Sequence, residues 1–404
     1  MSKLENILRY ASENVPYYIN YFKVHDKDPL DIRSYPIVTK KEYVENGDLM
    51  LAIGHNKEKL KVQKTSGTTG IPLNVYETFK EYYNQVMPLW RNRKQYYNIK
   101  ASSRKLTFYL DREVTKDLEK GYQFEAENEL VVGIYDVMDG IKTQYILDII
   151  DIYRPEYIRS TPTAICNFIN ACKKHGIYHC DYITYIESQS EFLFDFQREI
   201  MRDFFGDVAI SNQYGCTEIS AVAQEIPGCE GLHVLDMNAY VEIYNSEHIL
   251  TREENVDGEI VVTGLNSYTM PFIRYKIGDR GRIITNHCKC NHQIIDVTAG
   301  RANDFICLAD GRQEHSAVLV RGIEKCNQIH NQIIKFKFVQ ESLEQFVVYI
   351  SLRDQSFSDE IKRIFLDYIK DTVVKSSKWE FFFVDPEAME QKKSKFCYFE
   401  NRIK

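Results

Sequence analysis

Hydrophobic residues recur along this chain with two different periods, and the change of period divides the chain into regions. From Lys142 onward, segments with helical spacing alternate with short apolar segments, in the order TQYILDIIDIY, EYIRS, TPTAICNFINACKK, YITYIES and LFDFQREIMRDFF. Pro155 follows the first of these helices, and Gly176 closes the second. Helices and strands in alternation predict an α/β domain with a mainly parallel sheet.

The N-terminal part combines helical spacing with a strand–loop–strand pattern. Apolar residues predict an amphipathic helix within Leu4–Tyr21, whose end is followed by Pro16. Thr39 is the predicted cap of a second, short helix. Apolar and polar residues then alternate on both sides of a glycine-rich stretch, in KLKV and in PLNV, which predicts two strands joined by a loop.

A period of two dominates after about residue 235. NAYVEIYN, GEIVVTGL and GRIITN predict a β-rich subdomain over about 235–300. Three further strands follow Arg301, with a helix near Asp359–Lys370 that buries Ile361, Ile364, Phe365, Tyr368 and Ile369. We therefore expect an N-terminal domain over residues 1–300 and a small, mobile α+β domain over residues 301–404.

Composition narrows the class of protein more than its fold. The net charge is −7 and the pI is near 5.9, which gives no electrostatic footprint for nucleic acid. No stretch approaches the roughly 18 apolar residues that span a bilayer, and MSKLENILRYASENVPYY lacks the apolar centre of a signal peptide. We expect a cytoplasmic protein of unspecified oligomeric state, whose ten cysteines are reduced core thiols or metal ligands.

The glycine-rich stretch KTSGTTGIP is the first candidate for chemistry. Its glycines are too close together for a Walker loop, and no helix begins at its end, which excludes a dinucleotide fingerprint. Backbone N–H groups and the hydroxyls of its serine and threonines suit an anion. The same residue types are common in surface turns, so the stretch alone leaves both interpretations open.

Four further motifs follow in a fixed order. They are YGCTE at 214–218, MPFIRYKIGD at 270–279, GRANDFI at 300–306 and KKSKFCYF with Lys395. Together with TSGTTGIP, this order resembles the adenylate-forming superfamily of acyl-CoA synthetases, peptide-synthetase adenylation domains and luciferases. YASENVPYYINYF, YPIVTKKEY and GLHV favour its phenylacetate-CoA ligase branch, and within it the CapK-like proteins of capsular polysaccharide biosynthesis. The resemblance covers essentially the whole chain.

The resemblance implies an AMP-forming ligase. A carboxylate attacks the α-phosphorus of ATP to give acyl-AMP and pyrophosphate, and the acyl group then passes to a second nucleophile, often the thiol of coenzyme A. Positioning and charge neutralisation dominate the first step. The implied cofactors are ATP/AMP, Mg²⁺ and coenzyme A, and the other partner is a small carboxylic acid.

The resemblance also assigns residues to the phosphates. Glu218 would hold Mg²⁺ between phosphate oxygens, because a carboxylate and phosphates are the usual surroundings of this ion. Thr217 would contact the α-phosphate, and Lys395 would stabilise the charge of the acyl-phosphate. The residues that would wrap the β- and γ-phosphates are Thr65, Ser66, Gly67, Thr68, Thr69 and Gly70.

Other positions are assigned to the nucleoside. Tyr214, followed by Gly215, would stack on adenine, and Asp279 would accept hydrogen bonds from the ribose hydroxyls. Arg301 would bind ribose or phosphate. Arg274 is left open between a role in the site and an ion pair in the β-rich section.

The same resemblance implies a hinge and shows where the chain departs from the family. Asp304, with Asn303, stands where the small C-terminal domain of the family rotates between the two reaction steps. Leu73 replaces a lysine that often follows the glycine-rich loop, and Ile277 replaces the threonine before Gly-Asp. The chain also departs from the phenylacetate ligases after Gly311, which weakens the inference that coenzyme A is the acceptor.

Two alternatives to a coenzyme A ligase follow from these departures. One keeps adenylation but transfers the acyl group to an amine or hydroxyl, for example on a glycan precursor. The other is an inactive nucleotide-binding or scaffold protein. The presence of Glu218, Asp279, Arg301 and Lys395 argues against the second.

A second constellation favours a structural metal. Cys229 and His233 stand in CEGLH, and Cys288 and Cys290 form CKC about 55 residues later. One histidine and three cysteines are a ligand set used by tetrahedral zinc, with His287 and His292 as rival ligands. Free thiols beside a surface histidine are the alternative.

The sequence does not identify the acid. Its pocket is expected before the Mg²⁺ motif, lined by Tyr109, Tyr135, Ser188, Ser190 and Asn212. Cys216 lies inside YGCTE, but a nucleophilic role is excluded because no histidine or aspartate partner pattern accompanies it.

Overall fold

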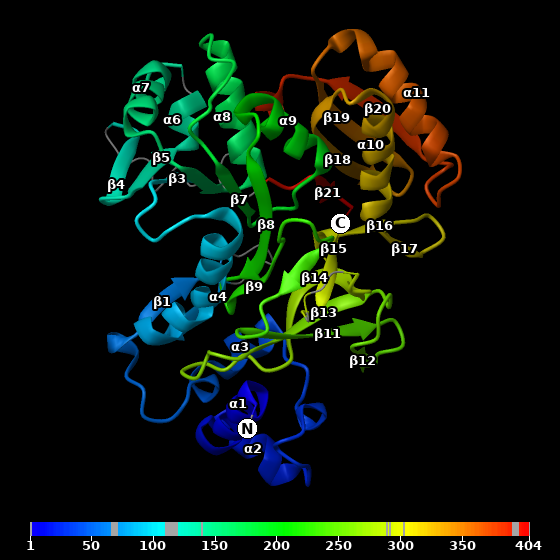
Figure 1. The fold of residues 1–404 in the computed structure, drawn as a ribbon. Helices are drawn as coiled ribbons and strands as arrows, with labels where there is room; N and C mark the ends of the chain where they lie inside the picture. The colour runs from blue at the N-terminus through cyan, green and yellow to red at the C-terminus, as the bar shows by residue number, and fades with distance from the viewer. Residues whose placement is uncertain are drawn as a thin grey trace. The chain divides into compact units, whose positions relative to one another are not determined.

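The computed structural model describes residues 2–65, 72–109, 120–138, 140–287, 290, 292–301, 304–389 and 396–403. The chain divides into two compact units (Figure 1). Unit 1 contains Met1–Ala101 and Ser211–Thr298, and unit 2 contains Ser102–Ile210 and Ala299–Lys404. Each unit therefore combines two stretches that are far apart in the sequence. In the described part of the chain, no helix is long and apolar enough to cross a membrane.

The helices of unit 1 carry the caps that their sequence predicts. Thr39 and Ser2 each cap a helix through a capping box, with a glutamate three residues later. The segment Leu4–Tyr21, expected to hold one helix, holds two, because Pro16 opens a second helix instead of following the last one. Proline suits a first helical position, since the N–H that it lacks has no partner there. The helices described in this unit are α1 (Lys3–Asn14), α2 (Pro16–Val24), η1 (Ile32–Ser34), α3 (Lys40–Asn46), η2 (Gly47–Met50), η3 (Lys57–Lys59) and α4 (Phe79–Tyr97).

The strands of unit 1 confirm the predicted β-rich section and the strands around the glycine-rich loop. β1 (Lys61–Lys64) and β2 (Asn74–Glu77) pair antiparallel. In the larger sheet the order is β12-β11-β13-β14-β15-β10-β9-β8, with antiparallel pairing wherever a register is recorded. These strands are β8 (Ala209–Cys216), β9 (Ser220–Gln224), β10 (Leu232–Val234), β11 (Ala239–Asn245), β12 (Leu250–Thr251), β13 (Gly258–Gly264), β14 (Tyr275–Ile284) and β15 (Ile294–Arg301).

An N-terminal segment is tied directly to the start of β14. The amide of Val38 donates to the carbonyl oxygen of Arg274 at 3.0 Å, and the amide of Lys276 donates back to Val38 at 3.0 Å. Tyr43 of α3 is fully buried, and its ring stacks on Phe272 with 4.5 Å between centroids. The MPFIRYKIGD segment is therefore held on both its backbone and its side chains.

The α/β pattern predicted from Lys142 onward is confirmed in unit 2. β3 pairs parallel with β5 and β6, and β6 pairs parallel with β7, whereas β4 is antiparallel to β5. In unit 2 the strand order is β7-β6-β3-β5-β4, and this part of the sheet is mixed because β4 is antiparallel to β5. The elements are β3 (Lys105–Tyr109), β4 (Tyr122–Ala126), β5 (Glu129–Gly133), α6 (Ile134–Met138), α7 (Thr143–Tyr153), β6 (Tyr157–Ser160), α8 (Pro162–Lys174), β7 (Tyr185–Gln189) and α9 (Asp195–Phe205).

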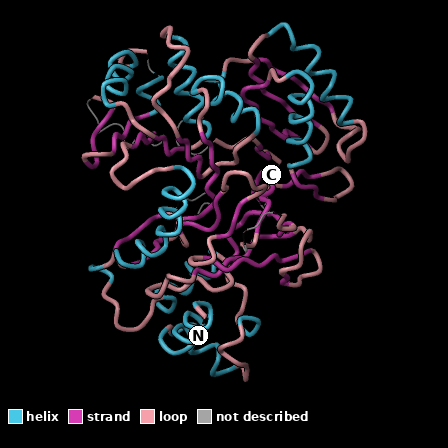
Figure 2. The backbone as a smooth tube through the Cα atoms, in the orientation of Figure 1, coloured by secondary structure: helices cyan, strands magenta, loops and turns pink. Residues whose placement is uncertain are grey.

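The C-terminal part of unit 2 is the compact α+β region that its sequence predicts. Figure 2 shows its helices beside a four-stranded sheet of order β20-β19-β18-β21. Phe338 of that sheet stacks on Phe365 of α11 at 5.6 Å. The elements are β16 (Phe305–Cys307), β17 (Gln313–His315), α10 (Ala317–His330), β18 (Ile333–Ser342), β19 (Gln345–Leu352), η4 (Gln355–Phe357), α11 (Ser358–Ile369), β20 (Lys378–Phe383), η5 (Pro386–Met389) and β21 (Phe399–Asn401).

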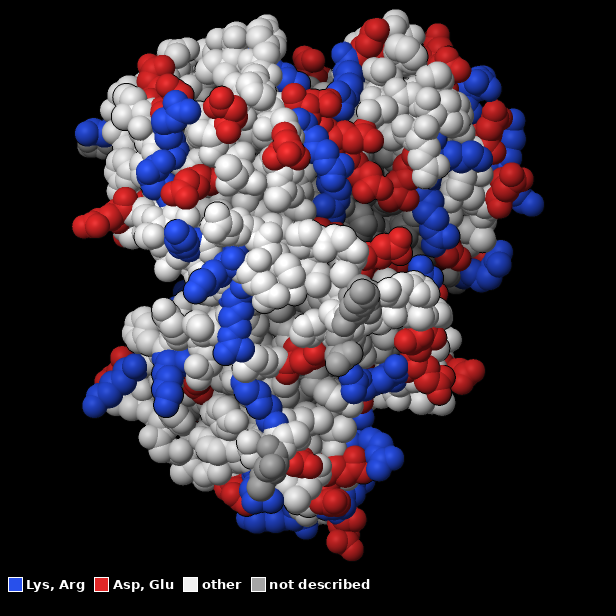
Figure 3. Space-filling view, in the orientation of Figure 1, with Lys and Arg blue, Asp and Glu red and all other residues white. Residues whose placement is uncertain are grey.

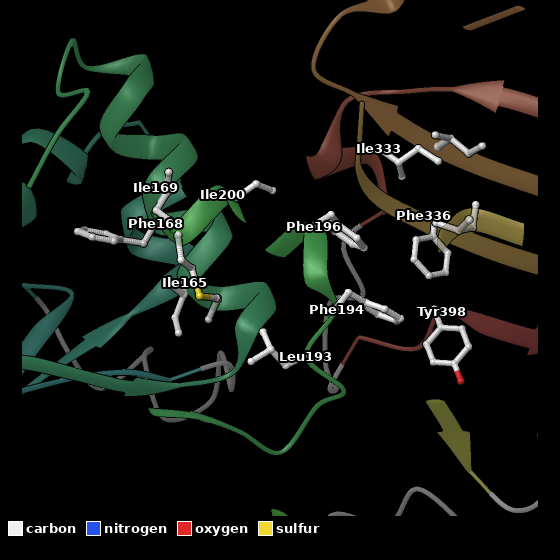
Figure 4. Packing of buried hydrophobic residues seen from close by; sticks show 14 of the residues in the cluster. Ile165, Phe168, Ile169, Leu193, Phe194, Phe196, Ile200, Ile333, Phe336 and Tyr398 are labelled. Atoms are coloured by element: carbon white, nitrogen blue, oxygen red, sulfur yellow. The ribbon is translucent and has the colours of Figure 1, made fainter. Parts of the chain in front are cut away.

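One hydrophobic core joins the two stretches of unit 2. Phe194 and Phe196, at the start of α9, face Phe336 and Tyr398 of the C-terminal sheet (Figure 4). The ring centroids of Phe194 and Phe336 are 5.3 Å apart, and those of Phe194 and Tyr398 are 6.2 Å apart. Residues 299–404 thus share a core with residues 102–210. Their expected action as a mobile lid, with a hinge at Asn303–Asp304, stays a prediction.

Acidic and basic side chains are interspersed over most of the face shown in Figure 3. The net charge of −7 is therefore not concentrated in one acidic surface on that face.

Candidate active site

The β8–β9 hairpin carries YGCTE and fixes the position of its acidic residue. The two strands approach so closely at Gly215 that a Cβ atom there would lie 1.9 Å from the backbone oxygen of Ser220. Only glycine tolerates such an approach. The amide of Ile219 donates to the carbonyl oxygen of Cys216 at 3.3 Å, which closes the turn. Glu218 lies in this turn and is 7% exposed.

Two other residues of the same turn, Thr217 and Cys216, were considered for a role in the reaction. Thr217 is half-buried beside Glu218, so the predicted α-phosphate contact lies next to the predicted Mg²⁺ ligand in the fold as in the sequence. Burial, and then the nearby charge of Glu218, raises the pKa of the Cys216 thiol well above its ordinary value. A thiol held in its protonated form is a poor nucleophile, which agrees with the exclusion of that role.

Two tyrosine–carboxylate hydrogen bonds join this hairpin to β14. The hydroxyl of Tyr275 donates to Oε1 of Glu218 at 2.7 Å. The hydroxyl of Tyr214 donates to Oδ2 of Asp279 at 3.0 Å. Each segment thus supplies one tyrosine and one carboxylate, and each carboxylate is held by the tyrosine of the other segment. The predicted metal, adenine and ribose residues are therefore brought together within unit 1.

Arg274, left open by the sequence, forms a buried ion pair. Its Nη2 lies 2.6 Å from Oε1 of Glu242, and its Nε donates to Oε2 at 3.0 Å. Both side chains are less than a tenth exposed. Arg274 has a φ of +49°, an unusual value for a residue with a side chain. The bidentate pair identifies Arg274 as a structural residue of the β-rich section.

The glycine-rich loop is described only at its two ends. Thr65 is buried, its amide donates to the carbonyl oxygen of Leu73 at 3.0 Å, and its Oγ1 accepts from the Leu73 amide at 2.9 Å. Leu73 is itself 5% exposed and belongs to the core of unit 1, which accounts for an apolar residue at this position. The predicted phosphate contacts Ser66, Gly67, Thr68, Thr69 and Gly70 lie outside the described residues.

The predicted residues after position 300 belong to unit 2. Asp304 closes a turn on Arg301: its amide donates to the Arg301 carbonyl, and its Oδ2 accepts from the Arg301 amide, both at 2.9 Å. Nε2 of His315 lies 2.8 Å from the same carbonyl oxygen. Lys395 and Asn303 lie outside the described residues. The ring of Phe396, directly after Lys395, lies under the ammonium of Lys335, 4.8 Å from it.

The predicted acyl-pocket residues are dispersed over several elements. Ser188 is fully buried, and its hydroxyl has no hydrogen-bond partner in the described part of the chain. Ser190 follows β7 with a φ of +70°, and Tyr135 of α6 is half-buried. The hydroxyl of Tyr109 donates to Glu125 at 2.5 Å. Asn212 belongs to unit 1, where its amide donates to Glu225 at 2.7 Å.

The predicted zinc ligands are partly assembled in unit 1. Sγ of Cys290 lies 3.2 Å from Nδ1 of His233. His233 is 2% exposed, and its Nε2 has no partner among the described residues. Burial, and then the neighbouring His292, lowers the pKa of His233 below its ordinary value. His292 itself bonds to Asp236, with 2.9 Å between Nδ1 and Oδ2.

Of the other predicted ligands, the structure describes Cys229 but not Cys288. Cys229 is a half-buried free thiol, and Cys288 lies outside the described residues. For the rival ligand His287, no contact with this cluster is recorded among the described residues. Cys290 is disulfide-bonded. Within residues 2–287 and the other described ranges, no group of three or more His, Cys, Asp or Glu side chains is placed to hold a metal ion.

Sequence reasoning missed Tyr275 as a residue of the site. Tyr275 is part of the MPFIRYKIGD motif, four residues before Asp279 on β14. β14 is irregular between these two residues, with a φ of +89° at Gly278 and a register shift against β13, so the spacing does not by itself place both side chains on one face. The signal in the sequence is the tyrosine inside the motif, but its distance to Glu218 is set by the tertiary structure.

Comparison with known proteins finds relatives of low sequence identity that span most of this chain. CapK of Staphylococcus aureus is 22% identical over 400 residues, covering 94% of this chain and 81% of that protein. Phenylacetate-coenzyme A ligase of Aromatoleum evansii is 26% identical over 324 residues, covering 76% and 71%. No family model matches the chain. These similarities are consistent with the resemblance to the adenylate-forming superfamily.

Solved structures of adenylate-forming enzymes share the fold of this chain. A 2-hydroxyisobutyryl-CoA ligase in complex with 2-HIB-AMP aligns with a TM-score of 0.75 and 13% identity, over 99% of this chain and 88% of that one. The acyl acid amido synthetase GH3.15 aligns with a TM-score of 0.64 and 13% identity, over 96% and 86%. The α/β architecture with its smaller α+β C-terminal region therefore matches the fold of these ligases.

Proposed function

We propose that this protein is an AMP-forming ligase that activates a carboxylic acid with ATP and passes the acyl group to coenzyme A. The observation that carries the proposal is the pair of hydrogen bonds that holds Glu218 and Asp279 against Tyr275 and Tyr214. Two buried or half-buried carboxylates on adjoining segments, one suited to a metal and one to a diol, are what a Mg²⁺–nucleotide site requires. Sequence similarity to phenylacetate-coenzyme A ligases supports the same reaction class.

The residues of unit 1 fit a Mg²⁺–nucleotide complex. Glu218 would hold a Mg²⁺ ion, which would offset the negative charge of the phosphates. Asp279 would accept hydrogen bonds from the two ribose hydroxyls, and Tyr214 would present its ring to adenine. Thr217 would donate to an α-phosphate oxygen. None of these residues reacts covalently, so their contribution is orientation and charge placement.

The proposed reaction has two steps, formation of the acyl-adenylate and transfer of the acyl group. A carboxylate oxygen of the acid bonds to the α-phosphorus of ATP, and the bond from that phosphorus to the pyrophosphate oxygen breaks. The thiol sulfur of coenzyme A then bonds to the acyl carbon, its proton is released, and AMP leaves. In the first step Lys395 would place its ammonium on the developing negative charge, and Arg301 would bind the ribose or phosphate.

Transfer to an amine or hydroxyl is the alternative second step. The departure from the phenylacetate ligases after Gly311 favours it, and an amido synthetase is among the solved structures with this fold. A glycan precursor of capsular polysaccharide is one such acceptor. Both outcomes use the same adenylation step, and an inactive homologue would lack it.

Carboxylate-dependent ATP–pyrophosphate exchange across a library of acids tests the first step. We expect exchange with at least one acid, and product formation that depends on coenzyme A. Product formation that requires an amine or a hydroxyl compound, and not coenzyme A, would support the alternative acceptor. No exchange with any acid, combined with no binding of ATP, would show an inactive homologue.

Lys395→Ala tests the assignment of that lysine. We expect exchange to fall by about 100-fold or more, because a charge that stabilises the transition state is lost, while ATP binding changes little. Lys393→Ala, two residues earlier in the same basic segment, is the matched control. Equal effects of the two substitutions would contradict a specific role for Lys395.

We also propose a structural zinc ion on Cys229, His233, Cys288 and Cys290. The contact between Cys290 and His233, and the unpartnered Nε2 of His233, support it. A disulfide at Cys290 and zinc binding exclude one another, because zinc takes the thiolate. One zinc per reduced chain, lost in Cys290→Ser, is the expected result. A folded protein without zinc would overturn the proposal. We propose a cytoplasmic location as well, which the proposed use of ATP supports.

A further inference from the structure

We propose that Tyr275 is a positioning residue that orients the carboxylate of Glu218 toward the Mg²⁺–phosphate group of ATP. This inference rests on the proposed function, since it concerns a residue behind the proposed metal ligand. It is carried by the 2.7 Å hydrogen bond from the Tyr275 hydroxyl to Oε1 of Glu218.

The tyrosine is fixed by its surroundings. Tyr275 is 1% exposed and lies in the core of unit 1. Its ring makes edge contacts with Tyr43 and Phe272, with centroids 5.5 and 5.2 Å away. Backbone hydrogen bonds of Val38 to the residues on either side of Tyr275 hold the strand as well. A ring packed on its sides in this way presents its hydroxyl in one direction.

The carboxylate depends on that hydroxyl for its orientation. Glu218 lies in a hairpin turn, and its side chain extends from the turn toward β14. Among the described residues, Tyr275 is the recorded hydrogen-bond donor to this carboxylate, and it engages one of the two oxygens. The other oxygen is then left in a defined direction for a cation. Residues that hold a metal ligand in this way strongly affect metal affinity.

The second tyrosine–carboxylate bond shows that the arrangement joins two segments rather than one pair of side chains. Tyr214 and Glu218 lie four residues apart around the hairpin, and Tyr275 and Asp279 lie four residues apart on β14. Because both bonds cross between these segments, the position of the metal ligand is set relative to the proposed ribose ligand. Loss of the Tyr275 hydroxyl should therefore affect metal-dependent binding and leave the nucleoside end in place.

Tyr275→Phe removes the hydroxyl and keeps the ring. We expect the Mg²⁺ concentration that half-saturates binding of a non-hydrolysable ATP analogue to rise by roughly 10-fold. Binding of the analogue without Mg²⁺ should change less than about two-fold, because the hydroxyl donates to Glu218 and not to the nucleoside site. The measurement is calorimetric titration of the analogue at several Mg²⁺ concentrations, which needs no knowledge of the acid. The ratio of the two affinities is independent of any loss of folded protein.

Two further variants make the result decisive. Tyr43→Phe also removes a buried phenol hydroxyl from the same cluster, where it donates to the carbonyl oxygen of Pro271 at 2.6 Å. It should lower the melting temperature without changing the Mg²⁺ dependence. Glu218→Gln should raise the half-saturating Mg²⁺ concentration at least as much as Tyr275→Phe.

The outcomes separate this inference from the proposed function. If Glu218→Gln changes the Mg²⁺ dependence and Tyr275→Phe leaves it within about two-fold of the parent protein, the positioning role is wrong and the metal site stands. If neither variant changes it, Glu218 is not the metal ligand and both proposals fall. If Tyr43→Phe has the same effect as Tyr275→Phe, the effect is general loosening of the core, which also overturns the inference.

Discussion

At the scale of single residues, the structure separates side chains that serve the site from side chains that only hold the fold. Arg274 and Tyr275 are adjacent in one motif, but their side chains bind different partners. Tyr275 reaches Glu218 in the candidate site, whereas Arg274 is bound by Glu242. Arg274 precedes β14 and has a φ of +49°, whereas Tyr275 is the first residue of the strand, so the backbone turns between the two side chains.

Breaking the buried ion pair should be costly. We expect Arg274→Ala to lower the free energy of unfolding by about 3 kcal/mol or more, because it leaves the Glu242 carboxylate buried without its partner. Lys276→Ala is the matched control, since Lys276 pairs with Glu259 at 3.0 Å with a fifth or more of each side chain exposed. That change should cost no more than about 1 kcal/mol. Urea unfolding measures both, and equal losses would contradict this account.

At the scale of elements, a buried glutamate ties the start of a helix to the segment before β14. The carboxylate of Glu81 completes the capping box of α4 with Thr78. It also accepts from the amides of Tyr268 and Thr269 at 2.7 and 2.5 Å, and from the Thr269 hydroxyl at 2.6 Å. One side chain therefore satisfies both a helix terminus and a loop.

Neutralising this carboxylate should destabilise the protein. We expect Glu81→Gln to lower the free energy of unfolding by about 2 kcal/mol at neutral pH, because an amide NH₂ would face the N–H donors that the carboxylate now accepts. Glu42→Gln is the control: Glu42 completes the capping box of α3 with Thr39, and no hydrogen bond from a distant segment to it is recorded among the described residues. It should cost about 1 kcal/mol or less. Comparable losses in the two variants would show that the loop contacts contribute nothing.

The same residue gives a pH dependence with a definite sign. Burial alone would raise the pKa of Glu81, but hydrogen bonds from Thr269 and Thr78 outweigh it and hold the pKa below its ordinary value of 4.5. A carboxylate whose pKa is lowered on folding stabilises the protein above its unfolded-state pKa, and that contribution is lost as the pH falls through the folded-state pKa. The stability difference between the parent protein and Glu81→Gln should therefore shrink below about pH 4.5. Urea unfolding over about pH 7 to 3 checks this, because the range extends below the unfolded-state pKa, and a difference that grows toward acid would refute it.

At the scale of the whole molecule, each of the two compact units combines stretches that are far apart in the sequence. Unit 2 takes its first stretch from the α/β region and its second from the C-terminal region, and aromatic residues join them. Phe194 contacts Phe196, Phe336 and Tyr398 with centroids between 5.3 and 6.2 Å apart. These rings are shown together in Figure 4.

Removing one of these rings should weaken the connection. We expect Phe194→Ala to lower the free energy of unfolding of unit 2 by about 3 to 5 kcal/mol, because Phe194 is 7% exposed and its loss leaves a cavity. Hydrogen exchange of the β18 and β21 amides should become faster. Phe382→Ala is the control, since that ring lies in the same C-terminal sheet but is 41% exposed. Unchanged exchange in β18 after Phe194→Ala would contradict the proposed connection.

Local elements were well determined by the sequence, because their causes are local. Thr39 predicts a helix start, Pro155 and Gly176 predict helix ends, and alternating residues predict β11 and β13. Pro16 is the exception: the same proline that can follow a helix also suits the first turn of the next, and the sequence does not choose between them. Strand direction within the sheet depends on which strands become neighbours, so the mixed sheet follows from tertiary structure.

The candidate site also has features that the sequence determined and features that only the tertiary structure decided. The order of the motifs was contained in the sequence, and with it the resemblance to the adenylate-forming superfamily and the proposed roles of Glu218 and Asp279. That Tyr275 holds Glu218, that Tyr214 holds Asp279 and that Arg274 is bound by Glu242 was decided only by the tertiary structure. The physical reason is that these contacts join residues between 32 and 65 positions apart, whose distance is set by how β8, β11 and β14 pack and not by anything near them in the chain.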